Sequence, residues 1–160
     1  MTRILVVADT PWVRSEVHAA LTEPDTTIVD LDDPAAAAAT VIRDEIDMVM
    51  VDMQVGSMGG MAVTRAIREH MLLNHFVPVP VIMLLDRSAD GFLARRAGAA
   101  AWVVKPFTSQ QLLDTFWKAK EREMPALDAL GESALQATDK VTASDTEPAH
   151  AAPAATVEPS

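Results

Sequence analysis

Five short apolar runs, each followed by a segment of helical periodicity, constrain the fold of this chain more than any other feature. The runs are nearly continuous and rich in branched residues, as is typical of strands buried on both faces of a parallel sheet. In chain order they are residues 3–8, 26–31, 47–52, 79–85 and 101–104. We therefore predict an α/β fold: a doubly wound, open, five-stranded parallel sheet with five helices distributed over both faces.

Capping signals mark the ends of the helical segments. Thr10-Pro11 offers an N-cap hydroxyl and a proline for the first helical position, and Asp33-Pro34 repeats this arrangement. Ser88 is expected to cap the fourth helix, and Gly98 to end it. The third helix should follow a glycine-bearing loop at residues 56–60. The last should begin near Thr108 or Ser109 and bury an apolar face of Leu112, Leu113, Phe116 and Trp117.

The 160 residues exceed what this pattern needs. We predict one domain over residues 1–124 and a disordered tail over residues 125–160, where alanine, proline and acidic residues dominate and no aromatic residue occurs.

Composition excludes several classes of function. The formal net charge of −10 argues against a nucleic-acid groove, which needs clustered basic residues. The absence of cysteine excludes disulfides, thiolate zinc sites and cysteine nucleophiles. No apolar run approaches the ~20 residues that span a bilayer, and the N-terminus lacks the pattern of a signal peptide. We therefore expect a cytoplasmic protein that binds neither nucleic acid nor membranes.

Polar residues follow four of the five predicted strands. Asp9, Asp52, Asp86 and Lys105 come at the carboxyl ends of the first, third, fourth and fifth runs. The carboxyl ends of parallel strands form the edge where such sheets bind ligands. Three carboxylates and one ammonium at this edge could hold Mg²⁺ and receive a phosphoryl group whose charge the lysine neutralises.

Over residues 3–123 the sequence resembles the receiver domain of bacterial two-component response regulators, including the chemotaxis regulators. The resemblance is carried by Asp9 after the first strand, Asp52 at the end of the third and the Lys105-Pro106-Phe107 segment after the fifth. It implies the strand order 2-1-3-4-5 and a phosphoryl group accepted on Asp52. It also implies that Lys105 contacts the phosphoryl group and that the peptide bond to Pro106 is cis.

By the same resemblance, Mg²⁺ would be bound by the carboxylates of Asp9 and Asp52 and by the backbone carbonyl of Gln54. The surface around Phe92, Arg95 and Trp102 would face protein partners, because receivers present their fourth helix and fifth strand to them.

Four positions depart from the family pattern. Ala8 stands where receivers have a second acidic residue, and Gly56 replaces the usual loop proline. Leu85 replaces the threonine or serine whose hydroxyl turns toward the phosphoryl group, and Trp102 replaces a smaller aromatic residue. The departures at Leu85 and Trp102 weaken the usual coupling between phosphorylation and surface rearrangement.

Simpler interpretations remain for two of these carboxylates. Asp52 alone could cap the glycine-rich loop, and only its combination with Asp9 and Lys105 is specific. Asp86 could restore the acid missing at position 8, repel the phosphoryl group or face water, and we favour water.

The resulting hypothesis is a single-domain response regulator, a phosphoprotein of a phosphorelay and not an enzyme. A histidine kinase or phosphotransfer protein would supply the phosphoryl group, and a protein target would read the output from a monomer or weak dimer. The alternative is an atypical receiver that acts as a docking module independently of phosphorylation. A flavin carrier of the same topology is disfavoured because residues 9–14 do not form a hydroxyl- and glycine-rich phosphate loop.

Overall fold

The computed structural model describes residues 1–56 and 58–122. The chain divides into two units after Leu127, and all of the described residues belong to the first unit. The tail predicted for residues 125–160 lies outside the described residues.

Five parallel strands form one sheet in the order β2-β1-β3-β4-β5, as predicted. Each lies within two residues of its predicted range, because the apolar runs that define the strands are also the segments that the helices cover. The strands are β1 (Thr2–Val7), β2 (Thr26–Leu31), β3 (Met48–Asp52), β4 (Val81–Leu85) and β5 (Ala101–Val104).

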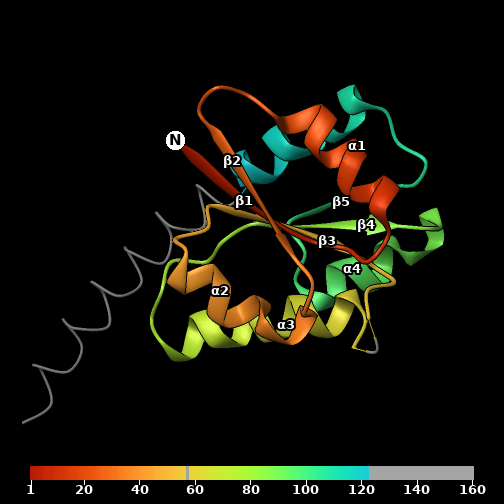
Figure 1. The fold of residues 1–160 in the computed structure, drawn as a ribbon. Helices are drawn as coiled ribbons and strands as arrows, with labels where there is room; N and C mark the ends of the chain where they lie inside the picture. The colour runs from red at the N-terminus through yellow and green to blue at the C-terminus, as the bar shows by residue number, and fades with distance from the viewer. Residues whose placement is uncertain (57, 123–160) are drawn as a thin grey trace, which may run out of the picture. The chain divides into compact units, whose positions relative to one another are not determined.

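Helices cover both faces of the sheet (Figure 1). The helices are α1 (Pro11–Leu21), α2 (Ala37–Arg43), α3 (Gly60–Leu73), α4 (Gly91–Ala97) and a last helix over residues 109–122. One face carries α1 and the last helix, and the other carries α2, α3 and α4. Short 3₁₀ turns, Pro34–Ala36 and Ser88–Asp90, precede α2 and α4.

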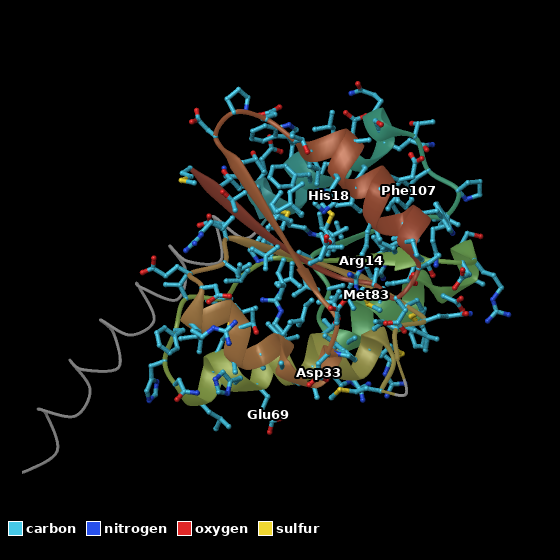
Figure 2. The ribbon with its side chains drawn as sticks, viewed as in Figure 1. Arg14, His18, Asp33, Glu69, Met83 and Phe107 are labelled. Atoms are coloured by element: carbon cyan, nitrogen blue, oxygen red, sulfur yellow. The ribbon has the colours of Figure 1, made fainter. Side chains whose placement is uncertain are left out.

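Alternating side chains of the central strands build a separate core on each face. Met50 and Leu84 pack in the cluster beneath α1 and the last helix. Val49 and Val51 pack beneath α2 and α3, whereas Met83 belongs to the cluster beneath α4 (Figure 2). All residues of β3 and β4 are buried. Full burial of a valine, leucine, isoleucine or methionine side chain contributes about 1.5–3 kcal/mol to the free energy of folding. Two rigid central strands therefore hold the edge where the polar residues emerge.

Several predicted caps are confirmed. The Asp33 carboxylate accepts a hydrogen bond from the Ala35 N–H at 3.0 Å. Thr108 and Gln111 form a reciprocal capping box at the last helix, with hydrogen bonds of 2.9 and 3.2 Å. Gly98 ends α4 in the left-handed conformation, at φ +93°.

Three local predictions were wrong. The Thr10 hydroxyl makes no capping bond, although Pro11 does occupy the first position of α1. Ser88 lies in the 3₁₀ turn, so α4 begins at Gly91, two residues later than a Ser88 cap implies. Trp117 is 51% exposed, because it lies beside the buried stripe of Leu112 and Phe116 and packs edge-on against the Phe116 ring.

Candidate functional site

The candidate site lies at the carboxyl edge of the sheet, where the strand order reverses between β1 and β3. Asp52 is the last residue of β3, and Asp9 follows the end of β1 by two positions. Asp86 and Lys105 come directly after β4 and β5. The parallel register therefore brings residues 9, 52, 86 and 105 to one edge, as predicted from the sequence.

Asp52 and Lys105 form a buried ion pair at the centre of this edge. The Lys105 Nζ donates to Asp52 Oδ1 at 2.8 Å, and the side chains are 10% and 2% exposed, respectively. Asp52 Oδ1 also accepts a hydrogen bond from the Gln54 N–H at 3.1 Å. Among the described residues no hydrogen bond ends on Oδ2 of Asp52, which leaves this oxygen as the nucleophile that the site can offer.

Asp86 makes a second ion pair with the same ammonium. Its Oδ1 lies 3.0 Å from Lys105 Nζ, and its side chain is 38% exposed. The interpretation of Asp86 as a carboxylate that only faces water was therefore wrong. Sequence reasoning placed Asp86 and Lys105 at the same edge, but the pairing depends on side-chain directions that a sequence does not give.

Burial and charge act in opposite directions on Lys105. Burial lowers its pKa, but the hydrogen bonds to Asp52 and Asp86 more than offset this effect, so the pKa lies above its ordinary value. The ammonium is therefore charged at neutral pH. The peptide bond between Lys105 and Pro106 is cis, as predicted.

The loop from β3 to α3 makes hydrogen bonds to both Asp52 and Asp9. The Asp9 side chain, on an exposed residue, accepts a hydrogen bond from the Gly56 N–H. Gly56 has φ +53°, which the proline usual at this position in receivers could not adopt, and a Cβ added here would lie 2.9 Å from Cγ of Pro34. Glycine at position 56 thus permits both the positive φ and the N–H that donates to Asp9, neither of which proline could supply.

Magnesium would find a sparse set of oxygen ligands here. Asp9 and Asp52 supply carboxylates, and the loop after β3 supplies the carbonyl of Gln54. Within the described residues there is no cluster of three or more acidic or histidine side chains that could hold a metal ion. Since Mg²⁺ in proteins commonly binds one or two carboxylates and keeps several waters, this donor set still suits it chemically.

Gly60, the first residue of α3, sets how closely that helix approaches Asp52. Its N–H donates to the Met53 carbonyl at 2.9 Å. A Cβ at this position would lie 2.4 Å from the Asp52 carbonyl oxygen and 2.9 Å from the Met53 Cα. The sequence placed Gly60 at the end of a loop but did not indicate this contact.

The two altered switch positions lie in one apolar cluster. Leu85 is fully buried, and Trp102 packs against the cluster beneath α4 that contains it. The Trp102 ring lies against Gly91, where a Cβ would come within 2.9 Å of the indole Nε1. The guanidinium of Arg95 lies over the ring, 5.6 Å from its centroid. Trp102 is therefore held against α4.

The expected partner surface is only partly open. Phe92 is 61% exposed, with the Arg96 guanidinium 5.8 Å from its ring centroid. Arg95 is exposed but lies over the Trp102 ring, which is only partly accessible. Phe92 is thus the apolar group that this face offers to a partner.

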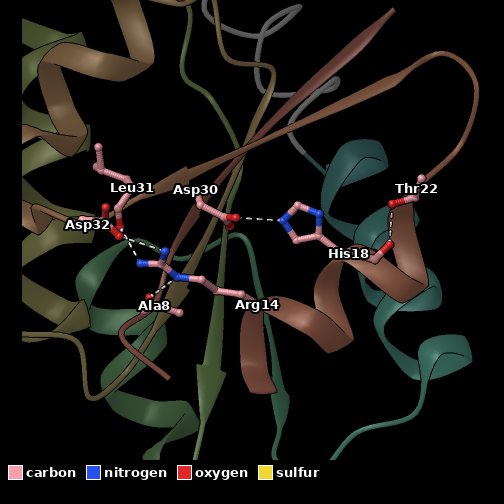
Figure 3. Close-up of polar contacts among 7 residues, drawn as sticks. All are labelled: Ala8, Arg14, His18, Thr22, Asp30, Leu31 and Asp32. Atoms are coloured by element: carbon pink, nitrogen blue, oxygen red, sulfur yellow. Dashed lines mark hydrogen bonds and ion pairs between the residues drawn. The ribbon is translucent and has the colours of Figure 1, made fainter. Parts of the chain in front are cut away.

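Arg14 is a positioning residue that sequence reasoning missed. Its guanidinium donates to the carbonyls of Ala8 at 2.6 Å and Leu31 at 3.2 Å, and it pairs with Asp32 at 2.8 Å (Figure 3). These contacts join α1 to the carboxyl ends of β1 and β2, so Arg14 fixes the backbone immediately before Asp9. The available signal was the position of Arg14 in the sequence. It lies one turn into α1, and α1 is the helix that follows Asp9.

Comparison with known proteins identifies the family. Residues 4–116 match the response regulator receiver domain. The chemotaxis protein CheY of Pseudomonas aeruginosa is 30% identical over 123 residues, covering 75% of this chain and 97% of that protein. The transcriptional regulatory protein TcrA of Mycobacterium tuberculosis is 32% identical over 112 residues, but the match covers only 42% of its length.

Solved structures agree with this assignment at the level of the fold. A structure of the Vibrio cholerae chemotaxis protein CheY4 superposes with a TM-score of 0.64 at 23% identity, covering 74% of this chain and 98% of that one. The chain therefore belongs to the response regulator receiver family, and its sheet has the flavodoxin-like topology of these domains. In residues 1–56 and 58–122, no helix combines the length and apolar character needed to cross a membrane.

Proposed function

We propose that this protein is a single-domain response regulator of a bacterial phosphorelay, which accepts a phosphoryl group on Asp52 and signals through protein contacts. The observation that carries the proposal is the buried Asp52–Lys105 pair at the switch point of the sheet. An isolated strand-end carboxylate could serve only as a cap. A nearly inaccessible carboxylate with one oxygen held by an ammonium and a backbone N–H is instead oriented for reaction at the other oxygen.

In the proposed transfer, Oδ2 of Asp52 attacks the phosphorus of a phosphohistidine on the donor protein. A P–O bond forms as the P–N bond breaks, and the electron pair of the broken bond stays on the imidazole nitrogen. Lys105 then neutralises part of the charge of the phosphoryl group, as expected of an ammonium 2.8 Å from the acceptor carboxylate. The domain acts as an acceptor and a signal, not as an enzyme.

Magnesium is the proposed cofactor, held by the carboxylates of Asp9 and Asp52 and by the Gln54 carbonyl. When bound, it would offset the negative charge of the phosphoryl oxygens. The role of this chain's residues is to present oxygen ligands, and the hydrogen bond from Gly56 to Asp9 orients one of them.

The proposed partners are a histidine kinase or phosphotransfer protein and a downstream protein target, all in the cytoplasm. Exposed Phe92 and its neighbouring arginines support a protein contact, since aromatic and arginine side chains are enriched in interfaces. The formal net charge of −10 supports a protein target over a nucleic acid.

Binding of beryllofluoride, a phosphoryl mimic, tests the function directly. We expect calorimetry in the presence of Mg²⁺ to show binding to the natural protein and none to Asp52→Asn, because the mimic requires the acceptor carboxylate. Asp44→Asn is the matched control. Asp44 is also ion-paired, to Arg43, but it lies at the opposite end of the sheet beside Arg3. The Asp44→Asn variant should therefore bind beryllofluoride as tightly as the natural protein does. Absence of binding to the natural protein would overturn the proposal.

A second candidate function is a docking module that works without phosphorylation. It is favoured by Leu85, which is fully buried and has no hydroxyl, and by Trp102, which packs closely against Gly91 and lies 5.6 Å from the Arg95 guanidinium. This candidate predicts no measurable Mg²⁺ affinity and partner binding that is insensitive to Asp52→Ala. A Mg²⁺ site in the calorimetric titration would count against it.

A further inference from the structure

We propose that Asp86 competes with the phosphoryl group for Lys105 and thereby sets the anion affinity of the site. This inference rests on the proposed function of Asp52 and concerns a position whose role the family resemblance leaves open. The observation behind it is that one ammonium serves two carboxylates, with Lys105 Nζ 2.8 Å from Asp52 and 3.0 Å from Asp86.

The charge of the site is already negative before any phosphoryl group arrives. In the resting site, the Asp52, Asp86 and Lys105 side chains together carry a charge of about −1. A phosphoryl group on Asp52 adds further negative charge beside the same ammonium. Because Lys105 is only 10% exposed, water screens these interactions less than it would at the surface. Asp86 therefore adds a repulsion that a neutral residue at this position would not.

The backbone of Asp86 is held in place by the sheet. Asp86 lies directly beyond β4, whose five residues are all buried, so its backbone is fixed relative to β3 and β5 on either side. Its side chain is 38% exposed while it pairs with Lys105. A phosphoryl group that takes up the ammonium must weaken the ion pair to Asp86, and this cost recurs in every phosphorylation cycle.

Asp86 also offers a route from the site to the surface. The hydroxyl that receivers use next to the phosphoryl group is missing, since position 85 is a buried leucine. Release of the Asp86 carboxylate from Lys105 is a change at the end of β4 that phosphorylation can still cause. The phosphorylated and unphosphorylated states would thus differ in the position of the Asp86 side chain, at the start of the loop that leads to α4.

The test compares beryllofluoride affinity, with Mg²⁺ present at pH 7.5, among the natural protein, Asp86→Asn and Asp44→Asn. Asparagine keeps the size of the side chain and removes its charge. We expect Asp86→Asn to bind the mimic about tenfold more tightly, the size of one like charge removed at close range in a partly screened site. Asp44→Asn removes the same charge from a carboxylate that is also ion-paired and partly exposed, at the far end of the sheet, and should leave affinity unchanged.

Salt dependence separates charge competition from a structural effect. Electrostatic repulsion weakens as ionic strength rises, so the ratio of the two affinities should shrink between low salt and 0.5 M salt, where the Debye length falls to only a few ångströms. Equal or weaker binding by Asp86→Asn overturns this inference while the proposed function stands. A ratio that does not change with salt also overturns it. Absence of binding to both proteins overturns the proposed function and, with it, this inference.

Discussion

Lys105→Met is expected to lower the free energy of unfolding by about 3 kcal/mol and to weaken beryllofluoride binding roughly a hundredfold. The stability loss arises because Asp52, 2% exposed, is left as a buried carboxylate without its cation. The binding loss arises because the charge-assisted hydrogen bond to the anion disappears. Urea unfolding and calorimetry measure the two effects.

Two comparison variants make this prediction specific. Lys118→Met removes a lysine from an exposed position of the last helix. It should change the free energy of unfolding and the free energy of beryllofluoride binding by no more than about 0.5 kcal/mol each. In an Asp52→Asn background, Lys105→Met should cost much less stability, because no buried charge is left unpaired at position 52. If Lys105→Met were equally destabilising in both backgrounds, the Asp52–Lys105 pair would not be the cause.

The fold could be predicted from the sequence because burial on both faces leaves a strong local signal. The runs that became β3, β4 and β5 consist almost entirely of apolar residues, a pattern typical of buried strands. The positions of Asp52 and Lys105 then follow from topology alone, since parallel strands present their carboxyl ends at one edge. The places of residues that stand at the carboxyl ends of strands were therefore predictable.

Roles that depend on side-chain direction or close packing could not be predicted in this way. The second ion pair of Lys105 requires the Asp86 side chain to turn toward β5, and nothing in the local sequence fixes that rotamer. Trp102 was expected on an open partner surface, but the missing side chain at Gly91 lets the ring pack against α4. A glycine within a helix indicates a close approach without indicating what approaches.

Gly60→Ala is expected to destabilise the domain by about 2 kcal/mol, although alanine favours helix more than glycine does. The added Cβ would lie 2.4 Å from the Asp52 carbonyl oxygen and 2.9 Å from the Met53 Cα. Both atoms belong to backbone at the end of the fully buried strand β3, which cannot move aside without disturbing the sheet. The same displacement would misplace the acceptor carboxylate, so beryllofluoride affinity should fall as well.

Gly91→Ala is the matched comparison, because it introduces the same methyl group at the start of another helix. Its Cβ would meet the Trp102 ring at 2.9 Å, but a side chain can rotate where backbone cannot. We expect a stability change within about 1 kcal/mol and altered Trp102 fluorescence, measured with Trp12 and Trp117 replaced by phenylalanine. If Gly60→Ala were as stable as the natural protein, the close approach of α3 to Asp52 would not constrain the site. If Gly91→Ala were the more damaging change, the Trp102 ring would be held more rigidly than β3, and an indole so fixed could take no part in signalling.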